Sequence, residues 1–388
     1  MPENKLLQIS KFVAPEVIFG VGALSQVGES AYRIGITKAF LVSDQGVMEA
    51  GWVDKALAYL KELGIEATVF YQLTTNPKDV EVAVGFQRYL ESGCDGIIAV
   101  GGGSPIDVAK AIAILATNGG QIKDYEGVNK ITSPLPPMVI VTSTGGSGAE
   151  VSQFSMIVEK QRQVKMAIIS KSLIPDIAIV DPLLLQTKNA RLTAATGVDA
   201  LSHAIEAYVS LAATALTDVH ALAAIRLISS NLRESVACRT NLEAKSAMAM
   251  ASLQAGLAFS NAILGATHAM THQVDGLLDL HHGETNGILL PYVMEFNMIS
   301  CGEKFANIAE ALGVQTTGLS KWKAAERGIS AIRKLFRDIG IPQRLSEVGM
   351  KEEYIEKLSQ NALKDACLVT NPRDTSAAEI EELYRRAL

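Results

Sequence analysis

Hydrophobic residues in the first half of the chain form short runs, and segments with helical periodicity lie between them. The runs are rich in β-branched residues and occupy 39–43, 67–71, 96–100 and 138–142. The intervening segments 52–63 and 80–92 repeat apolar residues at three- and four-residue spacing. Such alternation of strands and helices predicts a mostly parallel sheet covered by helices on both faces.

The second half shows helical periodicity throughout. The segments 199–209, 242–259 and 321–338 each carry apolar residues at helical spacing. Glycine and proline, which punctuate short elements, are concentrated before residue 185, whereas all six histidines come after it. We therefore predict an α/β domain over residues 1–185 and an all-helical domain over residues 186–388.

Composition and charge narrow the class of protein. The chain has 388 residues, of which 48% are hydrophobic and 20% charged, enough apolar content for two folded domains. Its net charge of −6 gives no basic footprint for nucleic acid. No apolar run reaches the ~18 residues of a membrane helix, and no secretory signal is visible. The four cysteines form no CxxC pair, so we expect free thiols and a cytoplasmic protein.

The first chemical signal is a glycine turn, GGGS at 101–104, between a predicted strand and a predicted helix. Without Cβ atoms, such a turn lets a phosphate approach backbone N–H groups at the positive end of the helix dipole. This context favours a phosphate site over a turn without a ligand. We expect Ser104 to cap the helix, Pro105 to begin it, and Asp107 to orient the loop or a cofactor hydroxyl.

Two further segments support a dinucleotide site. The cluster TSTGGSGAE at 142–150 also follows a predicted strand and combines hydroxyls with open backbone. Asp44 ends the AFLVSD run, where a carboxylate can accept ribose hydroxyls and repel a 2′-phosphate. The segment GVGALS at 20–25 is not a Rossmann fingerprint, because Ser25 stands at the third glycine position. Since Asp44 precedes the glycine turn, the sheet order should differ from a standard Rossmann unit.

The histidines give the strongest signal. Asp199 and His203 are four residues apart in a helical segment, His268 and His272 repeat that spacing, and His282 follows in an HHG turn. One carboxylate and three imidazoles suit Fe²⁺ or Zn²⁺ better than Mg²⁺ or Ca²⁺.

Spacing alone leaves several positions of this metal site open. Glu206 is an alternative ligand that ranks below Asp199, because Gly197 suggests a tight helix start there. The choice between His281 and His282 is undecided, and His220 is expected to be an ordinary helix residue. No HExxH motif is present, which disfavours a zincin peptidase.

Taken together, these motifs resemble those of the iron-containing (group III) alcohol dehydrogenases over almost the whole length. The similar segments are GGGSPIDVAK at 101–110, the DALSHAIEAYVS block ending at 210, and HAMTHQVDG with HHGETNGILLPYVMEFN within 268–297. The resemblance implies a dinucleotide-binding α/β domain of non-standard Rossmann type and a helical metal domain, as in dehydroquinate synthase-like architectures. It also implies metal ligands at Asp199, His203, His268 and His282.

The same resemblance implies a set of cofactor contacts, with NAD favoured over NADP by the acidic residue at position 44. Those positions are Asp44, Asn76, Gly102, Gly103, Ser104, Asp107, Ser143, Thr144, Ser147 and Lys165. His272 is the candidate for a proton relay or a nicotinamide contact, with packing behind the ligands as the alternative.

We therefore expect an NAD- and Fe²⁺-dependent (alternatively Zn²⁺-dependent) alcohol dehydrogenase. Its reaction would interconvert a short or medium primary alcohol and an aldehyde in a homo-oligomer, without nucleic-acid or membrane partners. The alternatives are a metallohydrolase that activates water at the same ligands, a dehydroquinate synthase- or glycerol dehydrogenase-like enzyme, and a non-catalytic nucleotide-binding module.

Overall fold

The computed structural model describes residues 10–162 and 164–388. The chain divides into two compact units. Val13–Lys188 forms an α/β unit, and Asn189–Leu388, with the described residues before Val13, forms a helical unit.

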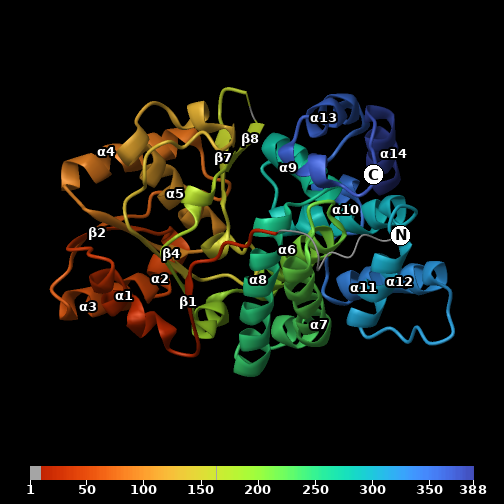
Figure 1. The fold of residues 1–388 in the computed structure, drawn as a ribbon, viewed down its shortest axis with the longest axis horizontal. Helices are drawn as coiled ribbons and strands as arrows, with labels where there is room; N and C mark the ends of the chain where they lie inside the picture. Colours follow the sequence, from red (N-terminus) through yellow and green to blue (C-terminus); the bar gives the residue numbers. More distant parts are fainter. Residues whose placement is uncertain (1–9, 163) are drawn as a thin grey trace. The chain divides into compact units, whose positions relative to one another are not determined.

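Six parallel strands, of which Figure 1 labels β1, β2 and β4, form the main sheet of the α/β unit in the order β1-β9-β6-β4-β2-β3. In register, Leu41 of β2 pairs with Ile98 of β4, and Ile98 pairs with Val139 of β6. The strands are β1 (Glu16–Phe19), β2 (Lys38–Val42), β3 (Glu66–Phe70), β4 (Gly96–Gly101), β6 (Met138–Thr142) and β9 (Ile177–Val180). This confirms the predicted parallel sheet.

Helices cover both faces of this sheet because alternate strand residues point to opposite sides. Phe40 and Val42 pack with residues of α4 (Asp79–Ser92) and α5 (Gly103–Asn118) in one core. Leu41 packs with residues of α1 (Val27–Arg33) and α3 (Trp52–Glu62) in a second core. Strand β2 is thus apolar on both faces, the pattern expected inside a parallel sheet.

The strand order places the glycine turn at a reversal of the sheet. From β2 the chain first adds β3 on one side, then crosses to add β4, β6 and β9 on the other side. In open α/β sheets, ligands bind beyond the carboxyl ends of the strands at such a switch point. Here β2 and β4 are the neighbours at the switch, and the segments that follow them contain Asp44 and GGGS at 101–104. The order is therefore not that of a standard Rossmann unit.

A second, three-stranded sheet belongs to the same unit and had no signal in the sequence. It has the order β5-β8-β7, with β7 and β8 antiparallel. Its strands are β5 (Gly127–Val128), β7 (Phe154–Glu159) and β8 (Val164–Ile169). The short elements of the unit are α2 (Gln45–Glu49), η2 (Ala23–Gln26), η3 (Ile122–Tyr125), η4 (Ala149–Val151), η5 (Lys171–Leu173) and η6 (Pro182–Thr187).

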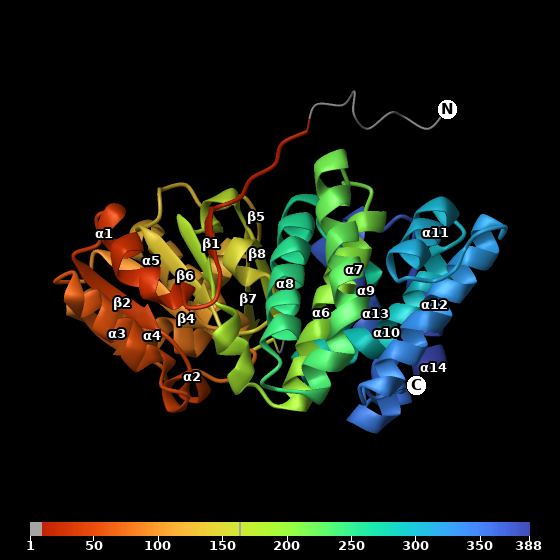
Figure 2. The same ribbon diagram turned by 90° about the horizontal axis from the view of Figure 1, so that it is seen from below.

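The second unit is helical, as predicted. Its first three helices lie side by side (Figure 2), and a further core joins α9, α10, α13 and α14. The helices are α6 (Ala190–Val209), α7 (Ala215–Ala237), α8 (Leu242–Ala262), α9 (Ala266–Leu278), α10 (His282–Asn297), α11 (Gly302–Ala311), α12 (Lys321–Asp338), α13 (Ile355–Ala362) and α14 (Ala377–Ala387), with the short helices η7 (Leu345–Val348), η8 (Glu352–Tyr354) and η9 (Ala366–Thr370).

One predicted boundary in this unit is wrong. We expected a tight helix start near Gly197, but α6 begins at Ala190 and carries Gly197 in its interior. The glycine serves packing between helices, because a Cβ there would lie 2.2 Å from Leu232 Cδ1 of α7. The glycine that suggested a helix start is therefore required by the close packing of α6 against α7.

All four cysteines are free thiols, as predicted. Among the described residues, no single helix has the length and apolar character to cross a membrane. The pair α8 and α9, bent by 102°, meets those criteria only when the two helices are taken together.

Candidate functional site

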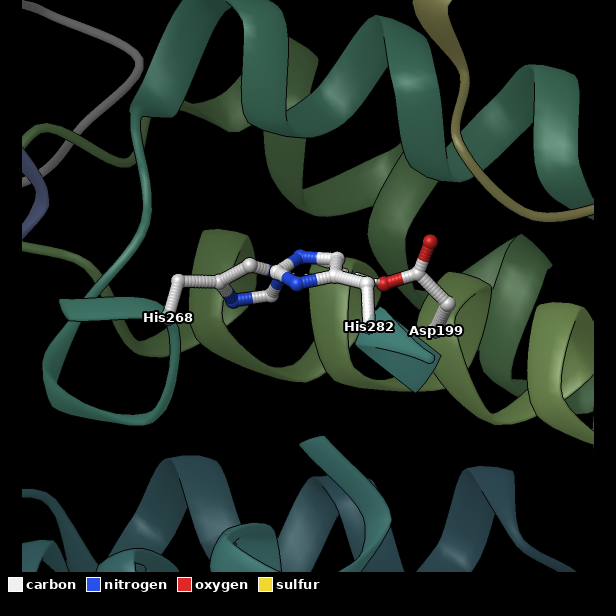
Figure 3. A group of neighbouring side chains, drawn as sticks. All are labelled: Asp199, His268 and His282. Carbon is white, nitrogen blue, oxygen red and sulfur yellow. Dashed lines mark ion pairs between the residues drawn. The ribbon is translucent and has the colours of Figure 1, made fainter. Parts of the chain in front are cut away.

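Three helices of the helical unit bring the predicted metal ligands together. Asp199 comes from α6, His268 from α9 and His282 from the first residue of α10 (Figure 3). The ligand atoms of these three residues all lie within 4.8 Å of one another. Asp199 Oδ1 is 3.9 Å from His268 Nε2 and 3.8 Å from His282 Nε2.

His203 brings a third imidazole to Asp199, although it is not in the close group of three ligand residues. It lies one turn after Asp199 on α6, with its Nε2 3.8 Å from Asp199 Oδ1. Its ring is stacked between those of His268, at a centroid distance of 4.6 Å, and Phe259, at 4.3 Å. Three Nε2 atoms therefore converge on one carboxylate oxygen.

Glu206 is a partner of one ligand and is not in the close group itself. Its Oε2 lies 2.6 Å from His268 Nδ1, so the ring's Nε2 faces Asp199. The same carboxylate accepts the backbone N–H groups of Gly265 and Thr267 at the start of α9. A carboxylate at a helix N-terminus is stabilised by the unpaired amides and the helix dipole. Glu206 thus caps α9 and orients His268.

His282 is held in the same manner by a second carboxylate. Asp275 Oδ2 lies 2.6 Å from His282 Nδ1, and Asp275 Oδ1 accepts the Thr285 hydroxyl. The start of α10 packs directly on α6, because a Cβ at Gly283 would lie 1.9 Å from the Ala195 carbonyl oxygen. Only glycine permits this approach, which brings His282 to Asp199.

The donor set and its electrostatics fit a divalent cation. Burial alone would raise the pKa of Asp199, but the imidazoles of His203, His268 and His282 hold it well below its usual range. Burial opposes a charge on His268, yet Asp199 and Glu206 outweigh it and raise the pKa to about 9. Asp199 therefore remains an anion inside the protein, which favours a cation beside it, and a metal ion bound at His268 Nε2 would take the place of the proton there. Ligands at the ~2.1 Å typical of zinc sites are about 3.4 Å apart in a tetrahedron, close to the separations found here.

In the α/β unit, the two glycine segments form one surface. A Cβ at Gly102 would lie 2.9 Å from Thr144 Cγ2, and a Cβ at Gly103 would lie 3.3 Å from Ser147 Cβ. The turn after β4 therefore touches the turn after β6 at positions where only glycine leaves room. The first amides of α5 have no intrahelical partner, so this surface fits a phosphate group.

The capping prediction for α5 is wrong in its position. The helix begins at Gly103, with Gly102 as N-cap in extended backbone and no side-chain cap. Ser104 is therefore inside the first turn. Because the N-cap residue is a glycine, no side chain of that residue bonds to the backbone amides at the start of α5.

Lys110 holds the end of the second glycine segment in place through hydrogen bonds. The ammonium group is fully buried and donates to the carbonyl oxygens of Ala149, Ser152 and Phe154 at 2.7, 2.6 and 3.0 Å. Ser143 joins the two segments, since its N–H donates to the Gly101 carbonyl at 2.8 Å. These bonds fix the spacing between the two turns.

The other predicted cofactor contacts lie in two places. Asp44 follows β2 and caps α2 through a 2.9 Å bond from Val47 N–H to Oδ1. Lys165 of β8 donates to Asn76 Oδ1 at 3.2 Å. Desolvation raises the pKa of Asp107 to about 7, although the ammonium groups of Lys110 and Lys165 oppose this. Lys165 thus donates a hydrogen bond to Asn76, and its positive charge also acts on Asp107.

The GVGALS segment is occupied by the protein's own carboxylate. Asp181 accepts the N–H groups of Gly22 and Leu24, each at 3.1 Å. This agrees with its exclusion as a nucleotide fingerprint, because two of its amides are already used.

The remaining histidines take separate places. His272 lies one turn after His268 on α9, buried, with Nδ1 2.9 Å from Asp365 Oδ2. His281 is the N-cap residue of α10 and is outside the close ligand group. His220 pairs with Gln254 and stacks on Phe12, away from the ligands.

Sequence reasoning named Glu206 only as an alternative ligand and missed the other two carboxylates behind the imidazoles. Asp275 is only seven residues from its partner His282, but the two lie on different helices, so helical spacing gave no signal for the pair. Asp365 has no signal either, since 93 residues separate it from its histidine. Asn286 was also missed; its Nδ2 donates to Asp199 Oδ1 at 2.8 Å.

Comparison with known proteins agrees with this arrangement. The family description "Iron-containing alcohol dehydrogenase" matches residues 14–182, and "Fe-containing alcohol dehydrogenase family, C-terminal" matches residues 193–388. The chain is 47% identical over 379 residues to 1,3-propanediol dehydrogenase of Klebsiella pneumoniae, covering 97% of this chain and 98% of that protein. It is 42% identical over 377 residues to NAD-dependent methanol dehydrogenase of Bacillus methanolicus, covering 97% and 99%.

A solved structure shows the same architecture. The crystal structure of a 1,3-propanediol oxidoreductase superposes with a TM-score of 0.96 at 46% identity, covering 98% of this chain and 100% of that one. The chain therefore belongs to the iron-containing alcohol dehydrogenase family and is an oxidoreductase acting on the CH–OH group of alcohols.

Proposed function

We propose that this protein interconverts a short primary alcohol or diol and its aldehyde, with NAD as redox partner and Fe²⁺ as the metal. The observation that carries the proposal is the convergence of three imidazole Nε2 atoms on Asp199 Oδ1 at 3.8–3.9 Å. Relatives named for 1,3-propanediol and methanol support small hydroxyl substrates. Zn²⁺ is the alternative ion for the same donor set.

The helical unit would hold the metal through Asp199, His203, His268 and His282. Glu206 and Asp275 would keep two of these rings turned, with Nδ1 on the carboxylate and Nε2 toward the ion. A divalent cation supplies Lewis acidity that favours loss of a hydroxyl proton, and NAD supplies the hydride acceptor.

The α/β unit would hold the dinucleotide. The amides at the start of α5 would bind the pyrophosphate, with the glycines keeping that surface clear of side chains. One Asp44 oxygen caps α2, which leaves the other for ribose hydroxyls and supports NAD over NADP. The complete set of contacts would be Asp44, Asn76, Gly102, Gly103, Ser104, Asp107, Ser143, Thr144, Ser147 and Lys165.

His272 would accept the hydroxyl proton during alcohol oxidation and return it during aldehyde reduction. It is buried one helical turn from His268 and is outside the close group of ligand atoms. An imidazole is suited to this task because its ordinary pKa is close to neutrality.

A substrate panel with metal analysis tests the proposal. The protein is loaded with Fe²⁺ or Zn²⁺, its bound metal is measured, and NAD or NADP reduction is followed with methanol, ethanol, 1-butanol and propane-1,3-diol. We expect about one ion per chain and faster reduction of NAD than of NADP. Failure of every alcohol with the metal-loaded protein, or ester hydrolysis in its place, would overturn the proposal.

A further inference from the structure

His272 and Asp365 form a buried pair beside the metal ligands. His272 Nδ1 lies 2.9 Å from Asp365 Oδ2, and the exposed fractions of the two side chains are 5% and 6%. A carboxylate only accepts hydrogen bonds, so Nδ1 carries a proton, and in the neutral ring Nε2 then carries the lone pair. The pair therefore selects one tautomer of His272.

Asp365 is itself rigidly placed. Its Oδ1 accepts the Cys367 N–H at 2.9 Å, which makes Asp365 the N-cap of η9. Its Oδ2 also accepts Gln273 Nε2 at 3.3 Å. Burial would raise the pKa of Asp365, but His272 and these donors outweigh it and lower the pKa. The side chain is thus a fixed anion.

The ring of His272 lies directly against the ligand rings. It is parallel to the His282 ring, at a centroid distance of 5.5 Å and an angle of 9°. It meets the His268 ring edge-on, with centroids 6.1 Å apart. The ring of His272 therefore lies beside two of the residues that would hold a metal ion.

We propose that Asp365 is a positioning residue that holds His272 with Nε2 as the acceptor for the proton of the substrate hydroxyl. This rests on the proposed function. In alcohol oxidation, the O–H bond breaks and its proton goes to Nε2, while the C–H bond breaks and its electron pair leaves as hydride to NAD⁺. The proton then passes to water, and aldehyde reduction reverses each transfer.

A second cation bound between His272, Asp365 and Cys367 is the competing interpretation. One ligand atom from each lies within 4.8 Å of the others. However, His272 Nδ1 and Asp365 Oδ2 are at direct hydrogen-bond distance, 2.9 Å, and Asp365 Oδ1 accepts the Cys367 N–H at 2.9 Å. Both oxygens of Asp365 are thus engaged in hydrogen bonds, and the contacts favour a proton in this pair.

Two matched asparagine substitutions separate proton positioning from metal binding. Asp365→Asn keeps an oxygen for Cys367 N–H but turns an NH₂ group toward His272 Nδ1, which forces the proton onto Nε2. We expect unchanged metal content and NADH binding, little change in KM, and kcat lower by about 10²- to 10³-fold. Asp275→Asn alters the same kind of pair behind a ligand, and should instead weaken metal binding.

The tautomer can be read directly by ¹⁵N NMR of the histidine rings in the Zn²⁺-loaded protein. We expect His272 to be protonated at Nδ1 in the wild-type protein and at Nε2 in Asp365→Asn. The wild-type spectrum alone decides the point if the variant does not fold. An Nε2-protonated His272 in the wild-type protein, or two Zn²⁺ ions per chain, would overturn the inference.

A double substitution separates this inference from the proposed function. His272→Ala should lower kcat, and adding Asp365→Asn to it should cause no further loss, since Asp365 acts through the ring. If His272→Ala leaves kcat unchanged, the role proposed for His272 is wrong. If His272→Ala lowers kcat while Asp365→Asn does not, only the role of Asp365 is wrong.

Discussion

The two units of this protein build their candidate sites by opposite means. In the α/β unit the surface exists because side chains are missing, since a Cβ at Gly102 would lie 2.9 Å from Thr144. In the helical unit the site consists of side chains, with imidazoles and a carboxylate converging from three helices. Backbone amides suit an anion such as a phosphate, whereas side-chain nitrogen and oxygen atoms suit a metal cation.

Buried carboxylates show the same contrast. In the helical unit, imidazoles and amide donors lower the pKa values of Asp199, Glu206 and Asp365 despite burial. In the α/β unit, desolvation raises the pKa of both Asp107 and Glu150 to about 7. Burial opposes the charge in every case, so the sign depends on whether the groups around each carboxylate outweigh desolvation. One unit thus maintains anions for a cation, and the other reduces negative charge near a predicted phosphate site.

The largest expected effect is that of removing one ligand of the helical unit. His268→Ala deletes a nitrogen donor and leaves Glu206 without its imidazole partner. We expect loss of bound metal and a fall in turnover on the order of 10⁴-fold, since Lewis acidity contributes several kcal/mol to the barrier. Metal analysis and NADH binding by fluorescence check this, and NADH affinity should persist. Full metal content in the variant would contradict the assignment.

An intermediate effect is expected at Glu150, whose side chain is fully buried. Its pKa is about 7 in the folded protein against an ordinary 4.5, because burial outweighs the nearby Lys110 ammonium. The folded chain therefore binds more protons than the unfolded chain between these values, so stability falls as pH rises through that window. The shift corresponds to at most about 3 kcal/mol.

Glu150→Gln should remove this loss because glutamine does not titrate. Thermal unfolding midpoints at pH 5 and pH 7.5 measure it, and the variant should gain on the wild-type protein as pH rises. Asp107, with a pKa also about 7, should leave a residual slope of the same sign. If the Glu150 carboxylate were instead stabilised by donors, as the acids of the helical unit are, the variant would be less stable than the wild-type protein at pH 7.5. The pKa shifts of buried carboxylates would then not differ in sign between the two units.

The smallest effect is expected from adding one methyl group to the glycine surface. Gly102→Ala places a Cβ against Thr144 Cγ2, so we expect the KM for NAD to rise about 10-fold with unchanged metal content. Thr144→Ser removes that methyl group and keeps the hydroxyl, so the double variant should recover much of the loss. A double variant as weak as Gly102→Ala would show that another property of Gly102 is needed.

Local patterns predicted most elements because they depend on neighbouring residues. The expected strand at 138–142 and helix at 321–338 have those bounds in the structure. The errors occurred at residues whose structural role depends on contact with an element distant in the sequence. Gly197 accommodates Leu232 of another helix, and Gly102, the N-cap of the helix after β4, lies against Thr144 of another turn.

The candidate metal site shows the same difference between features set by neighbouring residues and features set by distant ones. The i,i+4 spacing of Asp199 with His203 and of His268 with His272 was visible because both members of each pair lie on one helix. The hydrogen bond that His268 donates to Glu206 crosses from α9 to α6, and the one that His272 donates to Asp365 spans 93 residues. Nothing in the spacing distinguished a metal ligand from the carboxylate behind a ligand.

The amino-acid sequence alone determined that the chain makes a parallel α/β unit and a helical unit, and which residue types are available for a metal and a phosphate. These properties follow from side-chain periodicity and chemistry, which act over a few residues. The tertiary structure decided which nitrogen of each histidine is presented and which glycines meet another turn. Those outcomes depend on contacts between segments far apart in the chain, such as Gly283 against Ala195 and Gly102 against Thr144.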